Sequence, residues 1–264
     1  MPRKKACLVG INNYANPKYA LAGCLNDIDS LSSLLKDCFG FSENNITTLT
    51  DAAATRAGIL AGLSALLEGA AAGDTLIFAY SGHGCQKPST APGTQPNDMN
   101  DALVPYEATY ASLITDEELY NLITHRIMTP AIKFTAIYDC CHSGTMIRDV
   151  GFDPDTGMLV TAIENRCIFL PELQTLLKRA VNVGPYNVFS ACGDAETAAD
   201  VRSVPDERRA RGAFSYAIHK LLRTTPAMTV GDLDIRAKAV IQTVSPHVQN
   251  PEFYAVNADA PVFS

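Results

Sequence analysis

The amino-acid sequence predicts an α/β fold with a mostly parallel central β-sheet and helices on both faces of that sheet. Apolar, strand-like runs alternate with segments of helical periodicity, as expected when crossover helices join parallel strands. Two of these runs end abruptly in polar residues, as buried strands do when they present a site at the edge of a sheet. The chain has 264 residues and is 47% hydrophobic, which is enough for such a core.

The amino-terminal half of the chain supplies three predicted strands, at residues 6–11, 45–50 and 74–80. A helix that opens at residues 23–27 carries apolar residues at helical spacing, and Gly40 suits its carboxyl-terminal cap. A second helix, at residues 55–69, is rich in Ala and Leu. Residues 85–100 contain three prolines among small polar residues and are predicted to form a long loop.

The rest of the chain continues the alternation. Thr115 and Glu118 have the spacing of a capping box at the start of a helix. Further strands are predicted at residues 133–139, 186–191 and 251–256, and further helices at 170–180, 212–222 and 229–244. The strongly charged segment 205–211 is expected to be exposed.

Composition argues against several classes of protein. The formal net charge of −7 disfavours a nucleic-acid-binding surface. The basic cluster at residues 3–5 and the apolar run behind it are too short for a signal peptide or a membrane span, so a cytoplasmic protein without membrane partners is expected. The eight cysteines form no CxxC pair, which disfavours a zinc ribbon or a thioredoxin-like site.

Two polar motifs directly follow predicted strands. Ser81-Gly82-His83-Gly84 comes after the strand at 74–80, and Asp139-Cys140-Cys141-His142-Ser143-Gly144 after the strand at 133–139. The carboxyl ends of parallel strands share one edge of a sheet, so His83 and Cys141 are expected to meet there. A Cys thiolate with a His partner is a nucleophile and base pair for covalent catalysis.

Together the two motifs resemble the catalytic signatures of the metacaspases, the caspase-like cysteine proteases of bacteria, plants, fungi and protists. His83 precedes Cys141 by 58 positions, near the spacing found in caspases. The resemblance covers nearly the whole chain and is weakest at residues 151–185. It implies a caspase-like fold in a single peptidase domain over residues 1–264, with a p20-like region to about 150, a linker-like insertion over about 150–185 and a p10-like region over about 186–264. It also implies a monomer.

The resemblance assigns the nucleophile to Cys141, directly before His-Ser-Gly, and leaves Cys140 as a neighbour without a catalytic role. His83 then serves as the general base and later as the acid. The turn after each strand offers backbone N–H groups for the oxyanion, those of Cys141 and Gly84. This chemistry requires no cofactor.

The predicted S1 pocket, which receives the residue before the cleaved bond (P1), is acidic. Relatives line it with residues that match Asp27 and Asp139. Ser81 can add a hydroxyl, and Cys24 and Asp200 are weaker candidates. A carboxylate pair in a partly desolvated pocket favours a cationic side chain, so protein or peptide substrates with Arg or Lys at P1 are expected. True caspases hold Asp with Arg residues, and no Arg lies near either motif in the sequence. An alternative for Asp27 is a favourable first-turn charge on a helix dipole.

Calcium dependence stays open at this point. Many metacaspases bind Ca²⁺ through acids in the loop after the His motif, where this chain offers Asp98 and Asp101. Positions where relatives carry acids are Asn here, and Arg148 stands about where a later acid falls. The alternative is an Asn/Asp turn before a strand.

Self-cleavage is expected in the segment 148–185, after Arg148, Arg166, Lys178 or Arg179. Similar candidate sites are Arg208, Arg209 and Arg211, although solvated surface charge explains each of these basic residues at least as well. Three other functions remain in view. They are a catalytically silent caspase-like binding module, a caspase-like protease with a different P1 preference, and a redox sensor that uses Cys140 and Cys141.

Overall fold

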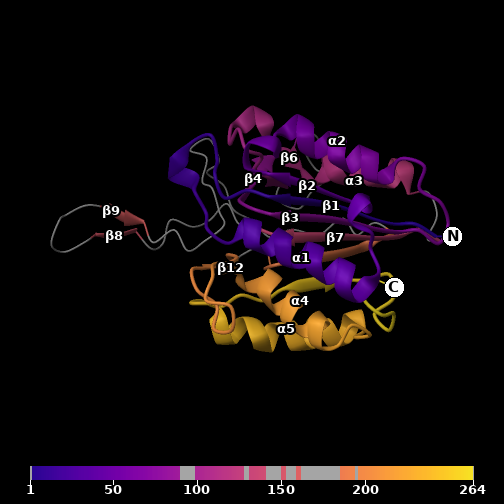
Figure 1. Ribbon diagram of the computed structural model, residues 1–264. Coiled ribbons are helices and arrows are strands. Elements are labelled where there is room, and N and C mark those ends of the chain that lie inside the picture. The colour runs from indigo at the N-terminus through magenta and orange to yellow at the C-terminus, as the bar shows by residue number, and fades with distance from the viewer. Residues whose placement is uncertain are drawn as a thin grey trace.

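The computed structural model describes residues 2–89, 99–127, 131–140, 150–152, 159–161, 185–193 and 196–263. At its centre is a six-stranded sheet with the strand order β13-β10-β7-β3-β1-β2 (Figure 1). The strands are Lys4–Gly10 (β1), Ile46–Thr50 (β2), Thr75–Ser81 (β3), Lys133–Asp139 (β7), Asn187–Ser190 (β10) and Glu252–Tyr254 (β13). All neighbouring pairs run parallel except β10 and β13, which are antiparallel. The mostly parallel sheet is therefore confirmed.

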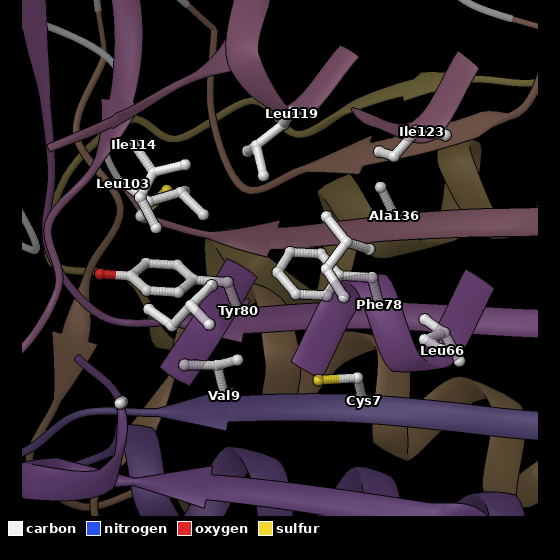
Figure 2. Packing of buried hydrophobic residues seen from close by; sticks show 14 of the residues in the cluster. Cys7, Val9, Leu66, Phe78, Tyr80, Leu103, Ile114, Leu119, Ile123 and Ala136 are labelled. Atoms are coloured by element: carbon white, nitrogen blue, oxygen red, sulfur yellow. The ribbon is translucent and has the colours of Figure 1, made fainter. Parts of the chain in front are cut away.

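Helices cover both faces of this sheet, as predicted. Helices α2 (Arg56–Leu67) and α3 (Asp116–Arg126) lie on one face, and α1 (Cys24–Phe39), α4 (Ala213–Thr224) and α5 (Val230–Val244) on the other (Figure 1). All seven residues of β3 are buried. Because successive side chains of a strand point to opposite faces, Phe78 and Tyr80 enter the core cluster under α2 and α3, and Ile77 enters the cluster under α1, α4 and α5. Figure 2 shows the first cluster, in which Cys7 and Val9 of β1 lie beside the two aromatic rings.

Local signals place several helix ends correctly. Gly40 caps α1 with a φ of 70°, a conformation that glycine adopts without steric cost. The side chain of Thr55 accepts a hydrogen bond from the Gly58 N–H at the start of α2. Thr229 caps α5 in the same way, and the helix ends at Val244 as predicted. The helix predicted at 170–180 lies outside the described residues.

The prediction of a loop from residue 85 was wrong at both of its ends. Strand β4 (Gly84–Pro88) pairs antiparallel with β5 (Met99–Leu103), and β5 pairs with β6 (Ile114–Thr115) in a separate three-stranded sheet. Pro88 can end β4 because this strand lies at the edge of its sheet, where a proline removes no bond from a central ladder.

Only half of the predicted capping box forms. The Thr115 hydroxyl accepts a hydrogen bond from the Glu118 N–H, 3.2 Å away, at the start of α3. The Glu118 carboxylate, however, pairs with Arg56 Nη2 at 2.5 Å and so ties α3 to α2. A longer-range ion pair has replaced the local contact that the spacing predicted.

The smaller elements complete the described chain. Val150–Phe152 (β8) pairs with Leu159–Thr161 (β9), and Asp200–Val201 (β11) pairs with Arg211–Gly212 (β12), which runs directly into α4. Short 3₁₀ turns lie at Pro17–Tyr19, Glu43–Asn45, Asp51–Ala53 and Tyr110–Ser112. Across the described ranges, no helix is both long enough and apolar enough to cross a membrane.

Candidate active site

The two motifs found in the sequence meet at one edge of the sheet. Strands β3 and β7 are parallel neighbours, and their last residues, Ser81 and Asp139, are register partners. The Gly82 N–H also donates to the Asp139 carbonyl at 3.3 Å. Cys140 follows β7 and is fully buried. Cys141, together with residues 142–149, lies outside the described part of the chain, so the position of its thiol stays a prediction.

The imidazole of His83 has a defined orientation. Its Nε2 lies 2.9 Å from the Tyr19 carbonyl oxygen, in the loop before α1. Because a carbonyl oxygen can only accept, Nε2 carries the proton. In the neutral ring Nδ1 is then the unprotonated, basic nitrogen. The tautomer is therefore the one in which Nδ1 can receive a proton from a nucleophile.

Two buried tyrosines hold the main chain of His83. The Tyr14 hydroxyl accepts a hydrogen bond from the His83 N–H at 2.7 Å, and the Tyr80 hydroxyl lies 2.7 Å from the His83 carbonyl and 2.8 Å from that of Val104. Burial raises the pKa of both tyrosines well above its ordinary value, so both hydroxyls stay protonated. Neither tyrosine was predicted from the sequence to belong to the site. Tyr80 directly precedes the Ser-Gly-His motif, but Tyr14 belongs to no recognisable pattern.

Gly82 is required by this arrangement of hydroxyls. A Cβ atom at this position would lie 2.6 Å from the Tyr80 hydroxyl oxygen and 2.8 Å from that of Tyr14. Any larger residue would push the tyrosines away from His83. Glycine at position 82 thus allows the backbone to approach the two tyrosine hydroxyls closely.

Asp27 is buried on the first turn of α1 and links three elements. Its Oδ2 accepts a hydrogen bond from the Ser81 hydroxyl at 2.9 Å, at the end of β3. The Gly212 N–H lies 3.1 Å from both carboxylate oxygens. Its Oδ1 accepts a hydrogen bond from Arg211 Nε at 2.8 Å. The carboxylate therefore does more than balance a helix dipole, because it joins α1 to β3 and β12.

Asp139 is oriented by the start of α4. Its Oδ2 accepts a hydrogen bond from the Ser215 N–H, 3.0 Å away, in the first turn of that helix. A carboxylate is favourable at a helix amino terminus. Since Asp27 binds the N–H of Gly212 just before α4, the two predicted S1 acids converge on the same helix start. No part in the site was predicted for α4.

The structure corrects one prediction about Arg211, which belongs to the segment 205–211 that was expected to be exposed. It also brings this arginine to Asp27, although no arginine lies near either motif in the sequence. Arg208 and Arg209 are exposed as predicted, but Arg211 is fully buried and bonded to Asp27. Its Nη1 also lies 2.9 and 2.7 Å from the two carboxylate oxygens of Glu207. A buried arginine requires such partners, and only the fold reveals that they are there.

The two weaker S1 candidates support the loop before α1. Cys24 is fully buried, and its backbone N–H donates to the side-chain oxygen of Asn12 at 2.9 Å. The carboxylate of Asp200 accepts hydrogen bonds from the N–H groups of Ala22 at 2.8 Å and Gly23 at 3.0 Å. Because this loop supplies the carbonyl that orients His83, both residues contribute to the site through the main chain. Gly84, the predicted oxyanion donor, begins β4 directly after His83.

The described residues do not by themselves fit a calcium site. Asp98 lies outside them, and Asp101 is buried on β5 and accepts a hydrogen bond from Gln86 Nε2 at 3.2 Å. The buried Asn100 donates to Glu117 at 3.1 Å, and its own side-chain oxygen has no hydrogen-bond partner within the described chain. In the described ranges, no group of three or more His, Cys, Asp or Glu side chains is placed to hold a metal ion. One amide oxygen falls short of the several carboxylates that Ca²⁺ usually takes.

Comparisons with known proteins agree with this geometry. Residues 4–150 match the family model for the metacaspase, peptidase C14 domain. Metacaspase-1 of Scheffersomyces stipitis is 29% identical in an alignment that covers 85% of this chain and 64% of that protein. Metacaspase-1 of Cryptococcus neoformans is 31% identical, with coverages of 85% and 56%. The chain therefore spans less than two thirds of the length of these relatives.

Two solved structures show that the fold is caspase-like. A protein from Geobacter sulfurreducens superposes with a TM-score of 0.69 at 18% identity, over 100% of this chain and 99% of that one. Caspase-1 from Spodoptera frugiperda gives a TM-score of 0.63 at 13% identity, over 100% and 90% of the two chains. At these identities the likeness concerns the fold and not the specificity.

Proposed function

Because the chain belongs to the metacaspase family of cysteine-type endopeptidases, we propose that this protein hydrolyses peptide bonds with Cys141 as nucleophile and His83 as general base. The observation that carries the proposal is the register pairing of Ser81 with Asp139 at the ends of β3 and β7. This pairing brings the His motif and the beginning of the Cys motif to one edge of the sheet, where parallel α/β sheets hold their sites.

The proposed reaction begins with proton transfer from the Cys141 thiol to His83 Nδ1. The thiolate attacks the scissile carbonyl, and the N–H groups of Cys141 and Gly84 bind the resulting oxyanion. His83 then returns the proton to the leaving amine. Water, activated by the same imidazole, hydrolyses the acyl-enzyme. The Tyr19 carbonyl supports the cycle because it holds Nε2–H and stabilises the imidazolium, at an Nε2 to oxygen distance of 2.9 Å.

Cleavage after Arg or Lys is the proposed specificity. Asp27 and Asp139 are both buried beside β3, the strand before His83. Ser81, the last residue of β3, is the hydrogen-bond partner of Asp27 and the register partner of Asp139. Two carboxylates in a poorly solvated pocket favour a cationic side chain at P1. Arginine adds a planar guanidinium that a carboxylate can bind through two hydrogen bonds.

Cleavage after Asp is the second candidate, and one observation favours it. Arg211 brings a guanidinium into contact with Asp27, and its buried Nη2 has no hydrogen-bond partner among the residues that the structure describes. A substrate carboxylate could accept from that nitrogen. The rest of the pocket opposes this alternative, because Asp27 and Asp139 would both repel a carboxylate.

Finer properties belong to the same proposal. We propose self-cleavage after a basic residue of the segment 148–185, a monomeric enzyme and a cytoplasmic location. Calcium enters only as a candidate activator, and the chemistry above uses no metal. Basic residues at 148, 166, 178 and 179 lie outside the described part of the chain, so mass spectrometry of the incubated protein is the direct test of self-cleavage.

Covalent labelling tests the proposed function. The purified protein is treated with a peptidyl acyloxymethyl ketone that ends in Arg, from which a thiolate displaces the carboxylate, and with a second probe that ends in Asp. We expect the Arg probe to modify Cys141, located by peptide mass mapping. Cys141→Ala abolishes the label, and Cys140→Ala, the matched control, retains it. Labelling by neither probe favours a silent module, and labelling by the Asp probe alone keeps the protease but refutes the acidic pocket.

A further inference from the structure

We propose that Arg211 is an internal occupant of the predicted S1 pocket, a latch that the P1 arginine or lysine of a substrate must displace. The inference rests on the proposed function, since it concerns the same pocket. It goes further, because it names a residue of the chain itself that competes with substrate.

The Asp27 carboxylate is filled by the chain's own donors. Arg211 Nε lies 2.8 Å from Oδ1, Ser81 Oγ lies 2.9 Å from Oδ2, and the Gly212 N–H is within 3.1 Å of both oxygens. These three donors engage both carboxylate oxygens, since the Gly212 N–H is shared between the two. A substrate guanidinium can therefore bind Asp27 only if Arg211 leaves.

The Arg211 guanidinium binds the Asp27 carboxylate in the way that the guanidinium of a P1 arginine is expected to bind it. It is a fully buried arginine whose guanidinium donates to the fully buried carboxylate of Asp27, on the first turn of α1. The Asp27 carboxylate accepts a hydrogen bond from Ser81, which is the register partner of Asp139. Arg211 thus has the same side chain as the proposed P1 residue, and it binds Asp27, which we propose as a binding residue for P1.

Glu207 is the second anchor of the latch. Both of its carboxylate oxygens accept from Arg211 Nη1, at 2.9 and 2.7 Å. Its side chain is 20% exposed, whereas that of Arg211 is 0% exposed. Burial tends to raise the pKa of Glu207, but hydrogen bonds from Arg209 and Arg211 outweigh this and lower it, so the anchor is ionised near neutral pH. Glu207 therefore lies on the solvent side of Arg211 and stabilises the arginine in its buried position.

Two features indicate that Arg211 is not fully stabilised in its buried position. Arg211 Nη2 is buried and finds no hydrogen-bond partner in the described ranges, an unfavourable state for a charged group. The residue also lies on β12, a two-residue strand that pairs only with the two-residue β11 among the described strands. Most of the segment between these two strands is exposed, with Val204 buried in it. Movement of this segment would therefore uncover little apolar surface.

The latch predicts a particular kinetic behaviour. A tethered arginine competes with substrate at a high effective concentration, so it weakens the binding of a basic P1 residue. Once the substrate has displaced it, the chemical step is unaffected. Weakening the latch should therefore lower KM and leave kcat unchanged.

Glu207→Gln is the decisive variant. The substitution keeps the shape of the side chain and removes the charge that anchors Arg211. We expect KM for an arginyl peptide to fall about tenfold, the scale of one charge-assisted hydrogen bond, with kcat unchanged. Arg208→Gln is the matched control, because Arg208 is an exposed neighbour and its substitution should change neither constant. The same comparison in the Cys141→Ala protein, by calorimetric titration with the uncleaved peptide, measures affinity without turnover.

An unchanged or raised KM in Glu207→Gln would overturn the latch and make Arg211 a permanent counter-ion of Asp27. Arg211→Ala provides a second arm, since it empties the site. If this variant folds, methylguanidinium should fill the vacated position and raise its melting temperature but not that of the wild type. If it does not fold, Glu207→Gln alone decides. The proposed function fails separately, when neither the wild type nor Glu207→Gln cleaves after Arg or Lys.

Discussion

The guanidinium of Arg211 donates from Nε to Oδ1 of Asp27 at 2.8 Å, and both side chains are almost completely shielded from solvent. This contact joins β12, at the entrance to α4, to the first turn of α1. The Asp27 carboxylate in turn binds the Ser81 hydroxyl at the end of β3. One carboxylate therefore connects the carboxyl-terminal part of the chain to β3, the strand that precedes His83. It also places a basic group in a pocket that we propose for basic substrates.

Asp139→Asn should reduce selectivity for arginine more than it reduces stability. The amide oxygen of the substituted side chain can still accept from the Ser215 N–H, which the carboxylate binds at 3.0 Å, so the start of α4 keeps its partner. The lost negative charge should lower kcat/KM for an arginyl peptide about 10- to 100-fold. The melting temperature should fall by only a few degrees.

A citrulline peptide provides the control for this prediction, because citrulline has the shape of arginine without its charge. The wild type should prefer arginine strongly, and the preference should shrink in Asp139→Asn. An undiminished preference would mean that Asp139 supports α4 and takes no part in the pocket.

Removal of the Tyr14 hydroxyl should slow catalysis through a change in the position of His83. Tyr14→Phe retains the ring that packs on the imidazole, with centroids 5.0 Å apart, but it leaves the His83 N–H without the acceptor at 2.7 Å. An unsatisfied buried donor costs about 1–3 kcal/mol, so kcat should fall roughly tenfold while KM stays within about twofold.

Tyr110→Phe is the matched control for Tyr14→Phe, since Tyr110 is 41% exposed and should tolerate the change. Steady-state kinetics on both variants, with melting curves, separates loss of positioning from loss of fold. A normal kcat in Tyr14→Phe would show that the tyrosine is structural only.

Gly82→Ala should disrupt the same support by steric contact. The added Cβ would approach the Tyr80 and Tyr14 hydroxyl oxygens to 2.6 and 2.8 Å, closer than real Cβ contacts. Overpacking of a core typically costs about 1–3 kcal/mol, and here it also displaces His83, so activity should fall at least tenfold.

Gly40→Ala separates this steric effect from backbone strain. A Cβ at Gly40 meets no atom of the described chain within 4 Å, but the residue has a φ of 70°. The control should therefore lose about 1 kcal/mol of stability and keep its activity. Equal activity losses in the two variants would argue against a special role for the Tyr14–Tyr80 pair.

Asp74 should contribute stability that disappears in acid. Its carboxylate accepts from the Arg3 backbone at 2.7 Å, from the Arg3 guanidinium at 2.7 and 3.0 Å and from the Ala71 N–H at 3.1 Å. Burial alone would raise the pKa of Asp74, but these hydrogen bonds and the Arg3 charge outweigh it, so the pKa lies below the ordinary 3.8. A folded-state pKa below the unfolded value stabilises the protein fully above the unfolded pKa, and the contribution is lost as the pH falls through the folded pKa.

Urea unfolding at several pH values tests this contribution. Asp74→Asn should lower the free energy of unfolding by about 1.5–3 kcal/mol at pH 7, and the difference from wild type should shrink below about pH 4. Asp37→Asn is the control, because Asp37 and Arg223 form an exposed pair at 2.8 Å that should contribute about 0–1 kcal/mol. A difference for Asp74→Asn that is independent of pH would refute the ionic origin of the effect.

Local sequence signals predicted the scaffold well. Strand β7 begins at Lys133 and ends at Asp139 as predicted, because an apolar run and the polar motif behind it mark both ends. Helix α5 also has its predicted bounds, since the Thr229 cap is a contact within four residues of sequence. Such features depend on neighbours that the sequence displays side by side.

Contacts between distant residues were beyond such reasoning. Arg211 looks like one more charge in an exposed segment until the fold places it against Asp27, and Tyr14 carries no motif that points to His83. The β4–β5 hairpin was missed for a related reason, because proline and glycine predict a loop while the pairing of Gly84 with Leu103 is non-local. The position of Cys141 relative to His83 remains a prediction from the two motifs.

The measurement that tests the central claim most directly is a peptidase assay on the wild type and on Cys141→Ala. Fluorogenic peptides that end in Arg, Lys or Asp are used, each with Ca²⁺ and with a chelator. We predict cleavage after Arg and Lys by the wild type and none by Cys141→Ala, and the chelator arm decides whether calcium activates. Cleavage after Asp alone, or equal activity in Cys141→Ala, would contradict the account.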